Sequence, residues 1–125
     1  MEKQSDMPET QLPENVYLAI DKQLFPLNKT TTRIGRHVEN DLIISDPLVS
    51  RWHAEVRFEE GAFVIYDMKT KSGTEVNNER VSRCVLKSGD TIKLANTPLL
   101  FIDRSDQVLR QSQDTTRTKG KKKKS

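Results

Sequence analysis

The sequence is poor in the residues that build disulfides, metal centres and membrane spans. It has one cysteine, Cys84, so no intrachain disulfide can form, and we expect this cysteine to be a small buried hydrophobic residue. Its two histidines, His37 and His53, match no recognised metal-ligand spacing, and no metal or other cofactor is expected. No apolar stretch approaches the roughly 18–20 residues of a membrane-spanning helix. The first residues also lack the cationic and then apolar order of a signal peptide, so we expect a cytoplasmic protein.

The sequence also lacks a set of residues that would support catalysis. Ser50 and His53 could form a nucleophile–base pair, but no orienting carboxylate or oxyanion hole can be assigned to them. No cofactor-binding loop is visible either. We therefore expect a protein that is not an enzyme.

Hydrophobic residues and charges divide the 125 residues into three parts. Residues 15–103 hold most of the hydrophobic side chains, and their 12 basic and 12 acidic residues cancel, which predicts one neutral globular domain. Residues 1–14 form an acidic flexible tail, with one basic residue against four acidic ones, and 104–125 form a basic disordered tail, with eight against two. The formal net charge of +3 therefore comes from the tails.

Short apolar segments separated by turn-forming residues run through the predicted domain. Residues 54–58 alternate strictly between apolar and charged, which is typical of a strand with one buried face. Residues 62–66 are almost continuously apolar, as expected of a central strand. The sequence thus predicts an all-β fold, a β-sandwich of two mainly antiparallel sheets. The candidate strands are 16–20, 24–27, 31–34, 42–44, 53–58, 63–68, 75–77, 84–86, 91–94 and 99–102.

Three polar clusters lie in the predicted loops between these strands. They are Gly35-Arg36 with Asn40-Asp41, Ser50-Arg51-Trp52-His53, and Lys71-Ser72-Gly73-Thr74. Each cluster combines a residue suited to a tight turn with hydroxyl or cationic donors, which are the groups that bind a phosphate dianion. The sequence therefore predicts a phosphate-binding site built from loops.

The ordered set of motifs resembles the signature of a forkhead-associated (FHA) domain over most of residues 30–102. The motifs are Arg33-Ile34-Gly35-Arg36, Asn40-Asp41-Leu42-Ile43-Ile44, Val49-Ser50-Arg51-Trp52-His53-Ala54, Tyr66-Asp67, Ser72-Gly73-Thr74-Glu75-Val76-Asn77 and Leu86-Lys87-Ser88-Gly89-Asp90. The resemblance implies an FHA/SMAD-like β-sandwich that binds phosphothreonine peptides through loops at one end of its sheets.

Two residues are similar in position to phosphate-binding residues of the family. Arg36 matches the arginine, and a guanidinium can direct two donors at two phosphate oxygens without losing its charge. The alternative is a surface arginine paired with Asp41 or Glu39. Ser50 matches the serine whose hydroxyl and neighbouring amide contact the phosphate, or it closes a turn with its own backbone.

Three more residues are expected to touch the phosphopeptide. Arg51 lies where the family often has a second polar or cationic contact, and Lys71 lies where threonine is common, although either is equally explained as a solvated loop charge. Ser72 stands where an asparagine usually bonds the main chain of the bound peptide. Because serine is shorter and has one donor instead of two, we expect a weaker or water-mediated contact.

Four residues are expected to support the loops. His53 corresponds to a family histidine that holds the loop through side-chain hydrogen bonds without touching the ligand. Gly35 is expected to let the backbone turn sharply, Gly73 to adopt a conformation barred to other residues, and Thr74 to support the turn.

These features favour a phosphothreonine-reading adaptor or regulator in kinase signalling, with a threonine-phosphorylated protein or peptide as partner and a Ser/Thr kinase as a second candidate partner. Two other functions stay open. A phosphate-independent protein-interaction scaffold is motivated by Ser72 and Lys71, and binding of nucleic acid or an anionic surface is motivated by the Lys121–Lys124 run.

The N-terminal tail carries a candidate phosphoacceptor, Thr10. If Thr10 were phosphorylated, intramolecular attachment would raise its effective concentration at the domain and make even a modest site self-occluding. Thr115, Thr116 and Thr118 in the other tail are alternative acceptors.

Overall fold

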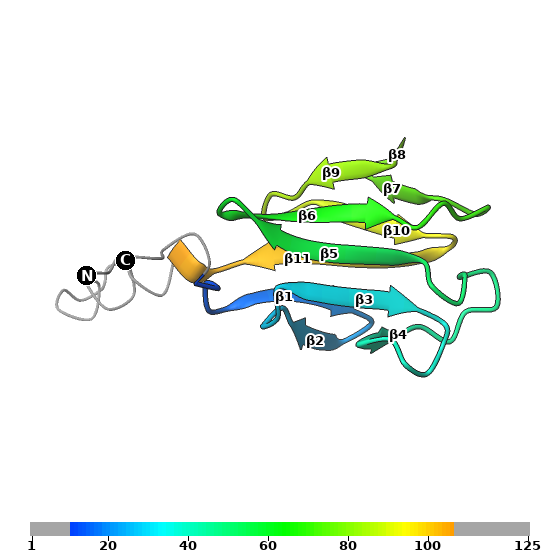
Figure 1. Cartoon of the computed structure of the whole chain (residues 1–125), viewed down its shortest axis with the longest axis horizontal. Coiled ribbons are helices and arrows are strands. Elements are labelled where there is room, and N and C mark those ends of the chain that lie inside the picture. The colour runs from blue at the N-terminus through cyan, green and yellow to red at the C-terminus, as the bar shows by residue number, and fades with distance from the viewer. Residues whose placement is uncertain (1–10, 107–125) are drawn as a thin grey trace, which may run out of the picture.

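The computed structural model describes residues 11–106 of the chain and confirms the predicted β-sandwich (Figure 1). Thr10, Thr115, Thr116, Thr118 and the Lys121–Lys124 run lie outside the described residues, and the domain boundaries at 15 and 103 stay a prediction. The strands of the described part are β1 (Val16–Ile20), β2 (Gln23–Pro26), β3 (Thr31–Gly35), β4 (Leu42–Ile43), β5 (Ala54–Glu59), β6 (Ala62–Asp67), β7 (Thr74–Val76), β8 (Glu79–Val81), β9 (Arg83–Val85), β10 (Thr91–Leu94) and β11 (Thr97–Asp103).

The strands form two sheets that face each other. One sheet has the order β2-β1-β11-β10-β7-β8 and the other the order β4-β3-β5-β6-β9. Strands β3 and β4 pair in parallel, and the other neighbouring strands of the described residues pair antiparallel. The sheets are therefore mainly antiparallel, as the sequence predicts.

Alternation along the strands places the core between the sheets. In β5, Ala54 and Val56 are buried while Glu55 and Arg57 are only partly covered. Strand β6 lies between β5 and β9, and its centre is buried, as its continuous apolar run predicts. The largest fully buried side chain is Phe101 on β11.

Two predictions about the edges of the sheets need correction. Strand β8 was not predicted, because only one of its three residues is apolar, and the two-residue turn at Asn77 and Asn78, both with positive φ, pairs it with β7. Cys84 is half-buried instead of buried, because β9 is an edge strand. Burial still raises the pKa of its thiol.

The loops that carry the three polar clusters gather at one end of the sandwich, to the right in Figure 1. Strands β3 and β6 end there, and β5 and β7 begin there. The first and last described residues lie at the other end, where the Arg104 amide donates a hydrogen bond of 2.9 Å to the Asn15 carbonyl. Among residues 11–106, no helix is long and apolar enough to cross a membrane.

Candidate functional site

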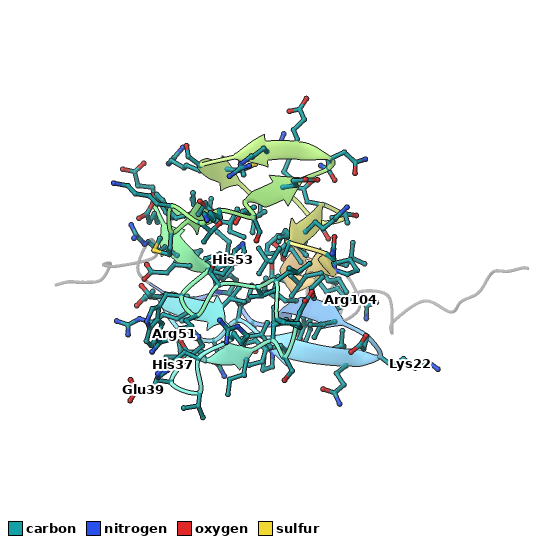
Figure 2. The ribbon with its side chains drawn as sticks, turned by 90° about the vertical axis from the view of Figure 1, so that its right-hand side faces the viewer. Lys22, His37, Glu39, Arg51, His53 and Arg104 are labelled. Carbon is teal, nitrogen blue, oxygen red and sulfur yellow. The ribbon has the colours of Figure 1, made fainter. Side chains whose placement is uncertain are left out.

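The loop between β3 and β4 is joined to the loop between β4 and β5 through their backbones. The Arg36 amide donates to the Ser50 carbonyl at 3.0 Å, and the His37 amide donates to the Arg51 carbonyl at 3.1 Å. Figure 2 looks onto this end of the molecule and shows the labelled His37 and Arg51 on the side of the sheet that contains β3 and β5. The two loops therefore hold one another in register.

Gly35 is required at this junction by space. A Cβ at residue 35 would lie 2.2 Å from the carbonyl oxygen of Arg51, and backbone at that distance cannot move aside cheaply. The φ angle of Gly35 is not in the left-handed region, so the expected sharp turn is not the reason for a glycine here. Its absent side chain lets the two loops approach closely.

Asn40 is a support that sequence reasoning placed in a cluster but gave no role. Its side chain is buried, and its Nδ2 donates to the carbonyl oxygens of His37 at 2.9 Å and Arg51 at 2.7 Å. One amide thus fixes both loops. The Asn40-Asp41 motif could have pointed to this role. The hydrogen-bond partners of Asn40, however, are backbone carbonyl groups, and a sequence does not reveal such contacts.

Arg36 is an exposed residue whose side chain is anchored through one of its three nitrogens. Its Nε donates to the Val49 carbonyl at 2.9 Å, which orients the guanidinium. The alternative salt bridge with Asp41 does not form, because Asp41 accepts hydrogen bonds from the Arg33 amide and from Lys29 Nζ, which together lower the pKa of that carboxyl. Arg36 makes no ion pair with any residue of the described part, so its terminal donors are available to a ligand.

His53 joins the second loop to the third. It is fully buried, its Nδ1 accepts a hydrogen bond of 2.9 Å from the Ser50 amide, and its Nε2 lies 2.8 Å from the Gly73 carbonyl. Because an amide only donates and a carbonyl only accepts, Nδ1 must be bare and Nε2 must carry the hydrogen. The neutral ring with that tautomer is therefore the form that satisfies both loops.

Some hydrogen-bond donors of the second loop already have a partner within the described part of the domain, and others do not. The Ser50 amide is occupied, whereas the Ser50 hydroxyl and the Arg51 amide make no hydrogen bond to another described residue. Trp52, for which the sequence gave no position, is 41% exposed, and its ring stacks on His37 with centroids 4.6 Å apart.

The third loop, residues 68–73, is organised around the carboxylate of Asp67. That carboxylate accepts hydrogen bonds from the hydroxyls of Thr70 and Thr74, each at 2.7 Å, and from the Thr70 amide at 3.0 Å. Burial opposes ionisation of Asp67, but these hydrogen bonds outweigh it and lower its pKa. Thr70 in turn accepts a bond of 3.0 Å from the amide of Gly73, whose φ is +87°.

Two predicted contact residues of the third loop differ in how they are engaged. Lys71 is exposed, and its ammonium group makes no ion pair among residues 11–106. Ser72 is also exposed, but its Oγ donates to the Leu48 carbonyl at 2.8 Å and so ties the third loop to the second. Sequence reasoning missed Asp67 and Thr70 as supports, although a carboxylate three residues before a threonine is a known local turn pattern.

The loop end thus presents cationic and hydroxyl donors that have no partner within the described residues, on a rigid set of hydrogen-bonded loops. A β-sandwich with such donors at its loop end has the chemistry of a recognition domain for anionic ligands. The FHA domain family model matches residues 32–95, about half of the chain. The chain therefore belongs to the FHA domain family.

Two curated relatives resemble the chain over the same region. An oxoglutarate dehydrogenase inhibitor of Corynebacterium diphtheriae is 42% identical over 79 residues, which cover 63% of this chain and 55% of the relative. The glycogen accumulation regulator GarA of Mycolicibacterium smegmatis is 41% identical over 78 residues, which cover 62% and 49%. The chain spans about half the length of these relatives. Their names, an inhibitor and a regulator, agree with the expectation that the chain is not an enzyme.

Two solved structures share the fold. A structure described as an analysis of phosphothreonine-dependent FHA domain interactions has a TM-score of 0.67 and 28% identity, and the match covers 70% of this chain and 95% of that one. EmbR of Mycobacterium tuberculosis in complex with a low-affinity phosphopeptide has a TM-score of 0.69 and 31% identity, and the match covers 77% of this chain and 26% of that one.

Proposed function

We propose that this chain is a phosphothreonine-reading FHA module that acts as an adaptor or regulator in Ser/Thr kinase signalling in the cytoplasm. Family membership supports this function, and so do the relatives named as regulator and inhibitor. Its partner is a threonine-phosphorylated protein or peptide. The solved FHA structures described as phosphothreonine-dependent or as a phosphopeptide complex support that ligand class.

One observation carries the proposal: donors from adjoining loops have no partner of their own among the described residues. They are the terminal nitrogens of Arg36, the hydroxyl of Ser50 and the amide of Arg51, with Lys71 on the third loop. A phosphate dianion would accept several charge-assisted hydrogen bonds of about 1.5–3 kcal/mol each, offset by an association cost of about 4–15 kcal/mol. Binding should therefore be of moderate affinity.

The test is a titration of the chain against a degenerate phosphothreonine peptide library and its unphosphorylated counterpart. Arg36→Ala should weaken phosphopeptide binding by about 2–3 kcal/mol, or roughly a hundredfold, with the fold intact. Arg33→Ala is the matched control, because it removes the same charge from an exposed position on β3, the strand that leads into the loop of Arg36. Equal affinity of the parent and Arg36→Ala would refute the assignment of the site.

A phosphate-independent scaffold is the second candidate function. Ser72 favours this function, because its only hydroxyl hydrogen is donated to the Leu48 carbonyl and so cannot be donated to a peptide. Equal affinity for the phosphorylated and the unphosphorylated library would establish this function in place of the first.

A further inference from the structure

Arg80 reaches from an edge strand to the third loop of the site. It lies on β8 opposite Glu75 of β7, and its side chain is exposed. Its Nη2 donates to the carbonyl oxygens of Thr70 and Lys71, each at 3.2 Å. An arginine outside the three polar clusters is therefore bonded to the backbone of a predicted contact residue.

The guanidinium group of Arg80 also lies close to Gly73. A Cβ at residue 73 would be 2.7 Å from both Cζ and Nε of Arg80. The φ of +87° already favours glycine at this position. The absent side chain thus has a second use, because it leaves the space in which the arginine crosses the loop.

The contact with Arg80 is what fixes Lys71. The other supports of the loop act on neighbouring residues: Thr70 is bonded to Asp67, and Ser72 to Leu48. Within residues 11–106, the hydrogen bond from Arg80 is the one that holds Lys71. Without Arg80, Lys71 would sit at the tip of a loop with no tie of its own.

We propose that Arg80 is a positioning residue for ligand recognition: it holds the backbone of the third loop at Thr70 and Lys71, so that Lys71 is presented to the phosphothreonine peptide. This inference rests on the proposed function. A loop that is already ordered loses less conformational freedom when a ligand binds, so the arginine raises affinity without touching the ligand.

The binding test uses Arg80→Met, which keeps the apolar part of the side chain and removes the donors. We expect the phosphothreonine peptide to bind about tenfold more weakly, a loss of roughly 1.4 kcal/mol. Arg83→Met is the matched control, because it removes the same charge from the neighbouring edge strand, where Arg83 lies over the Tyr66 ring, and affinity should stay within about twofold. Arg80→Lys, which keeps donors and charge, should recover part of the loss.

A double-mutant cycle separates positioning from direct contact. If Arg80 acts through Lys71, then Lys71→Ala weakens binding in the parent chain but adds little in the Arg80→Met background. Losses that simply add would overturn the proposal, because Arg80 would then act independently of Lys71. Unchanged affinity in Arg80→Met would overturn it as well.

A ligand-free measurement keeps the inference separate from the proposed function. Backbone amide order parameters and hydrogen exchange of residues 69–73 should show a looser loop in Arg80→Met than in Arg83→Met. An equally ordered loop in both variants would overturn the positioning role, whatever the peptide data show. If no phosphothreonine peptide binds the parent chain, the proposed function fails, while the loop measurement still decides whether Arg80 holds the loop.

Discussion

Replacing His53 with alanine should destabilise the folded domain through the two binding loops that this ring joins. The imidazole is the buried link between the second and third loops, because it bonds the Ser50 amide on one side and the Gly73 carbonyl on the other. Alanine removes both bonds and leaves without a partner the amide of the half-buried Ser50 and the carbonyl of the buried Gly73. The substitution thus tests whether the binding loops depend on this one ring.

The expected loss in the free energy of unfolding follows from the number of backbone groups that are left without a partner. A buried donor or acceptor that loses its partner costs about 1–3 kcal/mol, and His53 supports one of each while its own surface is 0% exposed. The space left by the ring adds to this cost. We therefore expect a loss of about 3–5 kcal/mol in the free energy of unfolding, a large part of the ~5–15 kcal/mol of a typical domain.

Urea unfolding at pH 7, followed by circular dichroism, measures this loss, and His37→Ala is the matched control. His37 is only partly buried; its Nδ1 accepts from the Glu39 amide at 3.0 Å, and its ring stacks on Trp52. The control should lose no more than about 1 kcal/mol. If both histidine variants lose the same amount, the bridging role of His53 is refuted.

Two further predictions concern the loop supports. Gly35→Ala should cost about 3 kcal/mol or more, because its Cβ would lie 2.2 Å from the Arg51 carbonyl oxygen, and a fall in Tm of less than about 12 °C would contradict this. Acid should destabilise the domain through Asp67. Burial opposes ionisation of this carboxyl group, but the hydrogen bonds from Thr70 and Thr74 keep its pKa below the ordinary 3.8. Because the folded-state pKa is the lower one, this stabilisation is present above the unfolded value near 4 and is lost as the pH falls through the folded value. Urea midpoints at pH 5 and pH 2.5 should therefore differ more for the parent than for Asp67→Asn, and equal differences would exclude a contribution from Asp67.

The fold was predictable because strand patterns are local. The strands 16–20 and 91–94 have the predicted bounds, and strict alternation located β5 correctly to within a residue. Strand β8 was missed for a physical reason: its pairing with β7 comes from backbone hydrogen bonds and a tight turn, not from burial of its side chains. Asn77 and Asn78 tolerate the positive φ that the turn before this strand requires, but the strand itself has no periodic signal.

Much less of the site could be predicted, because its supports bridge distant parts of the sequence. Motifs nominated Arg36, Ser50 and Lys71, and these residues have donors that the described part of the chain leaves free. The contacts that fix the loops join residues far apart in the sequence, such as Ser72 and Leu48, which are 24 positions apart. No local pattern marks such a pair, and the same holds for Arg80, which follows a strand-forming turn and resembles an ordinary surface arginine.

Ser72 shows that a sequence motif alone does not reveal whether a residue supports a loop or contacts the ligand. A hydroxyl has one hydrogen, and here that hydrogen is directed at the Leu48 carbonyl at 2.8 Å. While that bond holds, Ser72 can take part in peptide recognition only as an acceptor, whereas an asparagine amide offers both a donor and an acceptor. The donors that face a peptide must then come from elsewhere on the loops. The exposed Lys71, next to Ser72 in the sequence, and the exposed Arg51 of the second loop carry donors of this kind.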